Sequence, residues 1–267
     1  MKIHDIHIHT TLSRCCSDPN ATPENYLRLG QSRGMTVMGI SNHFWDSDVP
    51  GSSDWYRVQN FEYISQVKYA FPYEQLNRMG IRLLFGCETE YAQGVLGLDP
   101  AKAQLFDYIL IPHTHTHMKD FVIPKSVTDP DELAAFMTRT YREVVQIRLD
   151  APTSIAHPFI ACGYSPEVQM ELIERISDAD FRESFSIAAQ NGVGLELNAS
   201  TLHLQPGRQD FQGHPLTRMY SLAKECGVQF TMGSDAHSPD SWDKIDMEPL
   251  FWQACGITEA DFMDFVR

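Results

Sequence analysis

Short apolar runs alternate with longer amphipathic segments along the 267 residues of the chain. The apolar runs are rich in β-branched and aliphatic side chains, which predicts strands at residues 3–9, 36–41, 82–87, 107–112, 153–156, 192–197 and 229–232. Segments with the length and period of helices lie between them, at residues 22–33, 53–79, 129–150, 166–191, 215–225 and 258–267. This alternation predicts an α/β protein with a mainly parallel sheet and helical crossovers.

Local boundary signals agree with this pattern. Thr22-Pro23 and Asp129-Pro130 each offer an N-cap residue followed by proline at the first helical position. Gly192 follows a helical pattern and precedes an apolar run, where a C-cap glycine is expected. About seven strand–helix units favour a closed or nearly closed barrel, and a flavodoxin-like open sheet is the alternative.

The composition is that of a globular protein, with 43% hydrophobic and 21% charged residues. The chain shows no internal repeat or linker, so we expect one domain over residues 1–267. It has no apolar run long enough for a membrane span and no secretory h-region. Six scattered cysteines without a CxxC spacing favour a reduced, cytoplasmic protein.

The formal net charge of −14 argues against a nucleic-acid partner, because such a surface repels phosphate backbones at long range. It says little against a small phosphorylated substrate. Bound dications would cancel negative charge locally, so that an anion could approach a positive site on a negative protein.

Ligand-type side chains lie at the carboxyl end of every predicted strand. Parallel strands of a barrel point the same way, and barrel active sites are built at that face. Placement at one or two ends would mean little, whereas placement at all seven indicates a convergent site. In chain order these residues are His7 and His9; His43; Glu88; His113, His115 and His117; His157; Glu196 and Asn198; and Asp235 and His237.

Residue type and spacing favour a metal site. Side chains at i and i+2 of a strand share a face, so His7 and His9 can both reach one ion. Imidazole and carboxylate together suit zinc, manganese or iron. A carboxylate such as Glu88 can bridge two ions at the roughly 3.5–4 Å separation of two-metal hydrolysis. The pattern therefore predicts two or three divalent ions.

Each feature alone has an ordinary structural explanation. An isolated His-x-His pair is often surface chemistry, His157 could cap a strand, and Asp235 could be a helix N-cap. Taken together, however, these features would need seven unrelated explanations. Cys15 and Cys16 are interpreted as structural, with a thiolate ligand left open for either.

Five motifs occur in a fixed order: Asp5-Ile6-His7-Ile8-His9-Thr10, Asn42-His43, Gly86-Cys87-Glu88, Ile155-Ala156-His157-Pro158 and Gly233-Ser234-Asp235-Ala236-His237. In this order they resemble the polymerase-and-histidinol-phosphatase (PHP) family over nearly the whole chain. The resemblance implies a distorted seven-stranded (β/α)7 TIM-like barrel, a trinuclear metal site and phosphoester hydrolysis. The implied ligand sets are His7, His9, Glu88 and Asp235 for one ion, Glu88, His115 and His157 for a second, and Asp18, His43 and His237 for the third.

The chain departs from the family pattern in two places. Many members carry an acid or histidine five or six residues after the His-x-His pair, whereas Asp18 reaches the site only if this loop is longer. In the fourth-strand motif we favour His115 over His113 as the ligand. The loop after His9 also differs from the typical histidinol-phosphatase loop, so the resemblance does not carry that substrate over.

The resulting hypothesis is a phosphoesterase in which a hydroxide bridging the ions attacks phosphorus in line. We assign catalytic roles to Glu88, Asp235 and His237. The alternatives are phosphodiesterase, nuclease-like or amidohydrolase chemistry on the same site, or a non-catalytic metal-binding module. Residues that could contact the substrate, each with a solvated surface role as the alternative, are Arg14, His117, Lys119 and Arg208.

Overall fold

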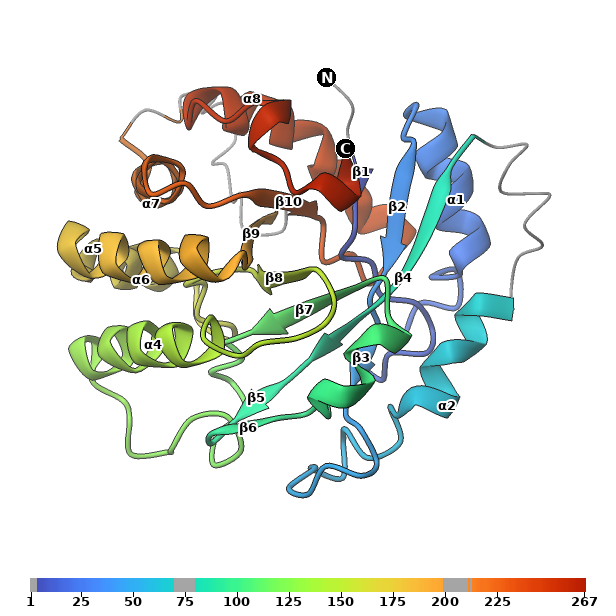
Figure 1. The fold of residues 1–267 in the computed structure, drawn as a ribbon, viewed down its shortest axis with the longest axis horizontal. Coiled ribbons are helices and arrows are strands. Elements are labelled where there is room, and N and C mark those ends of the chain that lie inside the picture. The colour runs from blue at the N-terminus through green and yellow to red at the C-terminus, as the bar shows by residue number, and fades with distance from the viewer. Residues whose placement is uncertain (1–3, 70–79, 199–210, 212) are drawn as a thin grey trace.

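The computed structural model describes residues 4–69, 80–198, 211 and 213–267. Its centre is a wall of strands that curves into a barrel (Figure 1). The strands of the wall are β1 His4–Asp5, β2 Val37–Ile40, β4 Arg82–Thr89, β7 Tyr108–Pro112, β8 Thr153–Ala156, β9 Gly194–Asn198 and β10 Phe230–Gly233. They neighbour one another in this order, and every neighbouring pair is parallel.

Hydrogen bonds between the first and last segments bring the two edges of the sheet together. The backbone N–H of Ile6 donates to the carbonyl of Met232 at 3.0 Å, and that of His9 donates to the carbonyl of Ala236 at 3.0 Å. The Met232 N–H donates to Nε2 of His4 at 2.9 Å. The sheet is therefore a nearly closed barrel of seven parallel strands, which confirms the predicted TIM-like fold and excludes the open flavodoxin-like sheet.

Three short strands lie outside this order. β3 (His43–Phe44) pairs in parallel with the end of β4, which places His43 opposite Glu88 in the register. β5 (Tyr91–Ala92) and β6 (Val95–Leu96) form an antiparallel pair. The sequence patterns did not predict these strands, because two residues are too few to show an alternation.

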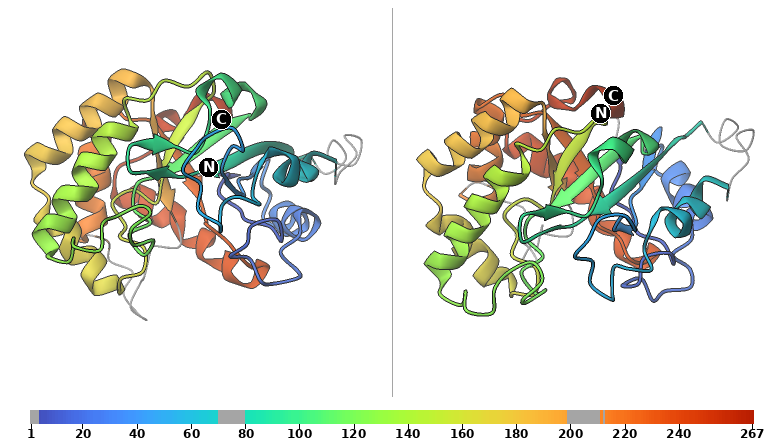
Figure 2. Two further views of the ribbon diagram at one scale, coloured as in Figure 1. Left: turned by 90° about the horizontal axis from the view of Figure 1, so that it is seen from below. Right: turned by 60° about the horizontal axis from the view of Figure 1, so that its bottom comes forward.

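Helices cover the outside of the barrel (Figures 1 and 2). α4, α5, α6 and α7 pack against one another, and α1 contacts β2. Within the part of the chain that the structure describes, no helix combines the length and apolar character needed to cross a bilayer. The α-helices are α1 Pro23–Ser32, α2 Phe61–Ile64, α4 Pro130–Val144, α5 Pro166–Arg175, α6 Asp178–Asn191, α7 Pro215–Glu225 and α8 Glu248–Ala254. The 3₁₀ helices are Ser65–Tyr69, Pro100–Leu105, Pro239–Met247, Glu259–Asp261 and Asp264–Val266.

The predicted caps form, but three predicted helices differ from the structure. The Asp129 carboxylate accepts from the backbone of Asp131 at 2.9 Å, as expected for an N-cap. The segment 166–191 is two helices, because Ser177 caps a new helix through the Asp180 N–H. Residues 258–267 form only 3₁₀ turns, and of residues 53–79 only 61–69 are helical, with 70–79 outside the described residues.

The His4 side chain makes the barrel seam sensitive to pH. It is buried, and this burial together with the charge of Arg82 lowers its pKa from 6.5 to about 3. Below pH 6.5 the unfolded chain therefore binds a proton that the folded chain excludes. This contribution to stability is complete above pH 6.5 and is lost as the pH falls towards 3.

We predict that His4 accounts for a loss of roughly 2–3 kcal/mol in the free energy of unfolding between pH 6.5 and pH 4.5. The variant His4→Gln keeps a neutral hydrogen-bond acceptor and should lack this loss. Urea titrations at several pH values, in the presence of a chelator, measure the difference between wild type and variant. The free energy of unfolding of the wild type minus that of the variant should fall by this amount as the pH falls from 6.5 to 4.5. A difference that does not depend on pH would contradict the assignment.

The Tyr108 ring fits against two glycines on neighbouring strands. Its hydroxyl donates to the carbonyl of Ile6 at 2.5 Å. A methyl group at Gly39 or Gly86 would overlap the Tyr108 side chain. The absence of a side chain at these two positions therefore allows a tyrosine to fill this part of the barrel.

We predict that Gly86→Ala lowers the free energy of unfolding by about 1–3 kcal/mol, because it overpacks the barrel. In a Tyr108→Leu background the same substitution should cost less, since the smaller side chain leaves room for the methyl group. A double-mutant cycle by chemical denaturation measures this coupling. An equal cost in both backgrounds would show that the ring is not the obstacle.

Candidate metal centre

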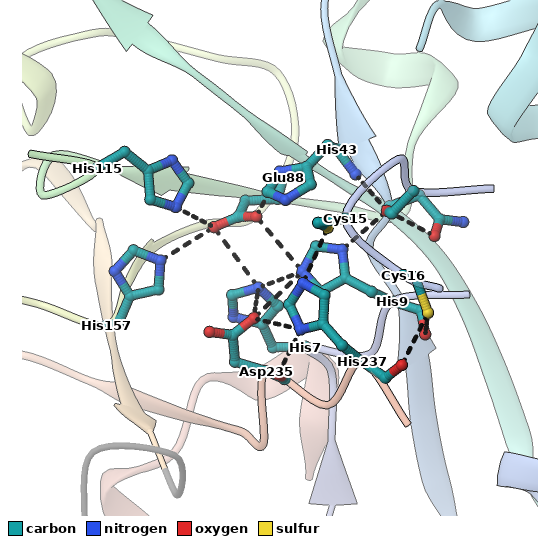
Figure 3. A network of polar contacts seen from close by, with 12 residues as sticks. His7, His9, Cys15, Cys16, His43, Glu88, His115, His157, Asp235 and His237 are labelled. Carbon is teal, nitrogen blue, oxygen red and sulfur yellow. Dashed lines mark hydrogen bonds and ion pairs between the residues drawn. The ribbon is translucent and has the colours of Figure 1, made fainter. Parts of the chain in front are cut away.

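The structure brings imidazoles and carboxylates from the ends of β1, β3, β4, β7, β8 and β10 to one place (Figure 3). This convergence is the arrangement that the positions along the sequence predicted. The residues drawn together there are His7, His9, His43, Glu88, His115, His157, Asp235 and His237, and Cys15 joins them from the loop after β1.

One oxygen of the buried Glu88 carboxylate faces three imidazoles. Oε1 lies 3.1 Å from Nε2 of His157, 3.6 Å from Nε2 of His7 and 3.8 Å from Nε2 of His115. Glu88 is 1% exposed, so its carboxylate contacts these imidazoles instead of water. A carboxylate at such a depth is costly unless it is paired or binds a cation.

The other oxygen of Glu88 faces a second group. Oε2 lies 2.9 Å from Nδ1 of His43 and 3.4 Å from Nε2 of His9. The Asp235 carboxylate is 3.3 Å from Nε2 of His9 and 3.4 Å from Nε2 of His7. Glu88 therefore stands between two clusters of nitrogen atoms, which is the position required of a ligand that bridges two ions.

Two outer carboxylates fix the orientation of imidazole rings. Oε1 of Glu196 lies 2.7 Å from Nδ1 of His7, and Oε2 of Glu90 lies 2.5 Å from Nδ1 of His115. Each carboxylate accepts a hydrogen bond, so each Nδ1 carries a proton and Nε2 of the neutral ring presents its lone pair to Glu88. Carboxylates commonly orient metal-binding histidines in this way.

Hydroxyl groups have the same effect on two more rings. Ser13 donates to Asn42 Oδ1 at 3.0 Å, so its oxygen accepts from Nδ1 of His9 at 2.9 Å. Thr114 donates to the carbonyl of His157 and accepts from its Nδ1 at 2.9 Å. His9 and His157 therefore also turn the Nε2 lone pair inward, and Nε2 of His7 and Nε2 of His9 lie only 3.1 Å apart.

These contacts test whether metal ions fit the residues present. Inward lone pairs that approach one another are unfavourable unless a proton or a cation lies between them. His43 is buried, and its Nδ1 faces Oε2 of Glu88 at 2.9 Å without being aligned for a hydrogen bond with it or with any other residue that the structure describes. His/Glu clusters that could hold metal ions are thus present, and the donor set fits them.

The metal-free electrostatics agree with this conclusion. Burial opposes protonation of His7, but the charges of Glu196, Asp235 and Glu88 outweigh it and raise its pKa well above the usual value. Burial also opposes ionisation of Glu88, yet His43 and His7 hold its pKa well below the usual value. The site therefore favours positive charge beside its carboxylates, and a dication would replace the protons.

Backbone conformation also contributes to this arrangement. His157 has φ +29° and Asp235 has φ +54°, values that are uncommon for residues other than glycine. A side chain at Gly233 would collide with Glu196 and His7. Uncommon conformations held by the surrounding structure are typical of functional sites.

The loop after His9 does not place Asp18 among the potential ligands. Its carboxylate accepts from Ser238 Oγ at 2.6 Å and from the Asn20 N–H at 2.8 Å. In its place Cys15 lies beside His237, with Sγ 3.0 Å from Nε2. The sequence interpretation of Cys15 as structural missed this contact, although Cys15 follows His9 by six residues, the spacing that was sought for an acid.

In the fourth-strand motif the structure brings His115, and not His113, to Glu88. Nε2 of His113 accepts from the Phe159 N–H at 3.3 Å, and its ring packs against Tyr141. His113 is therefore part of the core. His113 and His115 are two residues apart, so a strand would place both on one face, which is why spacing alone left both possible.

A cavity of about 560 Å³ opens onto these groups. It is lined by His43, His115, Asp235 and His237 from the centre, and by Cys15, Trp55, Tyr56, His117, Met118 and Cys162 around it. Of the described residues predicted to contact a substrate, His117 is the one that lines this cavity.

Two of the predicted cationic contacts, Arg14 and Lys119, lie away from this cavity. Lys119 is directed to the Tyr164 hydroxyl at 3.4 Å, and Arg14 is exposed and donates to the carbonyl of Asp54 at 3.1 Å. Arg208 falls outside the described residues. The structure therefore does not bring Arg14 or Lys119 to the cavity wall.

Comparison with known proteins agrees with the sequence motifs. The model of the PHP domain matches residues 5–200. A "probable phosphatase" of Vibrio vulnificus (strain YJ016) is 31% identical over 103 residues, a match that covers 34% of this chain and 39% of that protein. The chain thus matches less than half the length of this relative.

A solved structure shows the same fold. Histidinol phosphate phosphatase from Lactococcus lactis subsp. lactis Il1403, complexed with zinc, L-histidinol and phosphate, superposes with a TM-score of 0.64. The match covers 96% of this chain and 95% of that one at 16% sequence identity. At this identity the similarity supports the barrel and not a shared substrate.

We predict that Zn²⁺ or Mn²⁺ added to chelator-treated protein raises its melting temperature by on the order of 5 °C at saturating metal, because ions bind the folded chain alone. Glu88→Gln should remove most of this rise, since it removes the carboxylate shared by both clusters. Differential scanning fluorimetry measures the shift. Glu132→Gln, an exposed substitution on α4, is the matched control and should behave as the wild type. Equal shifts in the wild type and Glu88→Gln would place the bound metal elsewhere.

Proposed function

Because the chain belongs to the PHP domain family, we propose that it is a metal-dependent phosphoesterase that hydrolyses a small phosphomonoester. The observation that carries this proposal is the buried Glu88 carboxylate between two clusters of imidazoles. Divalent ions held there would neutralise charge on phosphoryl oxygens and activate water. We propose two or three such ions, of zinc, manganese or iron.

The proposed role of each residue follows from its position around the ions. Glu88 and Asp235 supply the negative charge that holds the ions, together with the inward lone pairs of His7 and His9. Glu196 holds the ring of His7 so that this lone pair stays in place. We propose that Glu88, Asp235 and His237 are the residues whose loss ends turnover.

The size of the cavity favours a small substrate over a polymer. About 560 Å³ fits a metabolite-sized molecule. Trp55 and Met118 line it, and its described lining contains neither lysine nor arginine, so the charge of a phosphate group would fall to the ions. An apolar or aromatic leaving group could contact Trp55, whose ring lies edge-on to His43 at 5.1 Å.

Histidinol phosphate is the first natural substrate to test, because the structural neighbour from Lactococcus lactis contains L-histidinol and phosphate. The loop after His9 differs from the typical loop of such enzymes, so we propose the reaction class and treat this substrate as a probe. Phosphodiester hydrolysis on the same site is the competing activity, and the assay below separates the two.

We predict that complete chelation abolishes hydrolysis of p-nitrophenyl phosphate and that Mn²⁺ or Zn²⁺ restores it. Asp235→Asn should lower kcat by at least about 100-fold, because it weakens the charge that holds the ions. Asp240→Asn, an exposed residue in the 3₁₀ helix that follows this loop, is the control and should retain activity.

The same assay includes histidinol phosphate and bis-p-nitrophenyl phosphate. A higher kcat/KM for the monoesters than for the diester supports the proposal. Activity that survives complete metal removal would contradict it, and activity on the diester alone would favour the phosphodiesterase alternative.

A further inference from the structure

We propose that Cys15 supplies a thiolate ligand to a metal ion held with His43 and His237, an inference that rests on the metal-dependent function proposed above. One ligand atom from each of these three residues and one from His9, a group of four, lies within 4.8 Å of every other. Sulfur and nitrogen donors at such separations can bind one ion at ordinary Zn–S and Zn–N bond lengths of about 2.3 and 2.0 Å.

The hydrogen bonds of His237 direct a lone pair at Cys15. Nδ1 of His237 lies 2.9 Å from the backbone carbonyl of Asp235. A carbonyl only accepts hydrogen bonds, so this nitrogen carries the proton and Nε2 has the lone pair. Nε2 then faces the sulfur of Cys15 at 3.0 Å. Two potential ligand atoms therefore meet where an ion could bind both.

His43 gives a second, independent indication. It belongs to the same group of four and is 6% exposed, and its Nδ1 lies 2.9 Å from Oε2 of Glu88 without being aligned for a hydrogen bond with it or with any other described residue. A buried imidazole nitrogen without a partner loses the hydrogen bond that it would make in water. A bound cation would remove this cost.

The neighbouring cysteine has a different environment. Cys16 is buried, and its Sγ donates to the backbone carbonyl of His237 at 2.8 Å (Figure 3). Cys15 is exposed to solvent and lines the cavity. The two neighbouring cysteines therefore differ: Cys16 is hydrogen-bonded to the backbone, and Cys15 faces the imidazoles.

Cys162 is the other cysteine near the centre. It lies in a separate group with His115 and His157. Its Sγ is 3.9 Å from Nδ1 of His157, the nitrogen that already bonds to Thr114, whereas Nε2 of the same ring faces Glu88. Cys162 therefore lies on the outer side of His157, and Cys15 is the better candidate for a thiolate ligand.

A thiolate has a consequence for metal choice. Sulfur is a soft donor that favours zinc or iron over manganese and magnesium. With Cys15 in place of a carboxylate, this position would select against the harder ions. The inference thus concerns which metal the site retains, beyond the presence of metal itself.

Cobalt substitution tests the inference directly. Chelator-treated protein is loaded with Co²⁺, and its near-ultraviolet absorption is recorded for the cobalt–thiolate charge-transfer band, with bound metal counted by mass spectrometry. Wild type should show the band. Cys15→Ser should lose the band and bind one ion fewer per chain, and Cys15→Asp should recover the ion without the band. Cys226→Ser, far along the chain on the outer helices, is the matched control and should behave as the wild type.

The outcomes separate this inference from the function on which it rests. A band that persists in Cys15→Ser, or one that disappears only in Cys162→Ser, would overturn the assignment of Cys15. Cobalt bound by the wild type without any band would overturn it as well, while leaving the metal-dependent function intact. A wild type that binds no metal would defeat both.

Discussion

The charge of a carboxylate removed from water must be compensated by its surroundings. The buried Glu88 imposes this constraint on the end of the barrel where the strands have their carboxyl ends. Its two oxygens face five imidazoles from four different segments of the chain. The mutual positions of these segments come from the parallel ladder and from the β1–β10 seam. The closed barrel therefore brings the compensating groups together. These groups are imidazoles, which can bind cations, and not the lysine or arginine of a salt bridge.

Hydrogen bonds around the centre determine what the histidines can do. Glu196, Glu90, Ser13 and Thr114 each accept from an Nδ1 atom, so the Nε2 lone pairs all point inward. A ring with the opposite tautomer would present a proton instead. This outer layer explains why residues that never reach an ion, such as Ser13, would still control how firmly one is held.

The path of the loop between His9 and helix α1 decides which of its side chains lies beside His237. Ser13 ties this loop to Asn42 and His43 through its single hydroxyl, and this contact fixes the direction in which the following residues leave. Cys15 then meets His237, while Asp18 passes on to Ser238. The path of a few residues thus decides whether a thiol or a carboxylate lies beside His237.

The sequence by itself determined the alternation of strands and helices, the parallel barrel and the placement of ligand-type residues at the strand ends, because apolar periodicity and capping act over a few neighbouring residues. Only the tertiary structure decided that His115 rather than His113 meets Glu88, that Cys15 rather than Asp18 joins His237, and that residues 166–191 form two helices. Each of these depends on contacts between residues distant in the chain, such as Ser13 with Asn42, whose geometry is set by packing and leaves no periodic trace in the sequence.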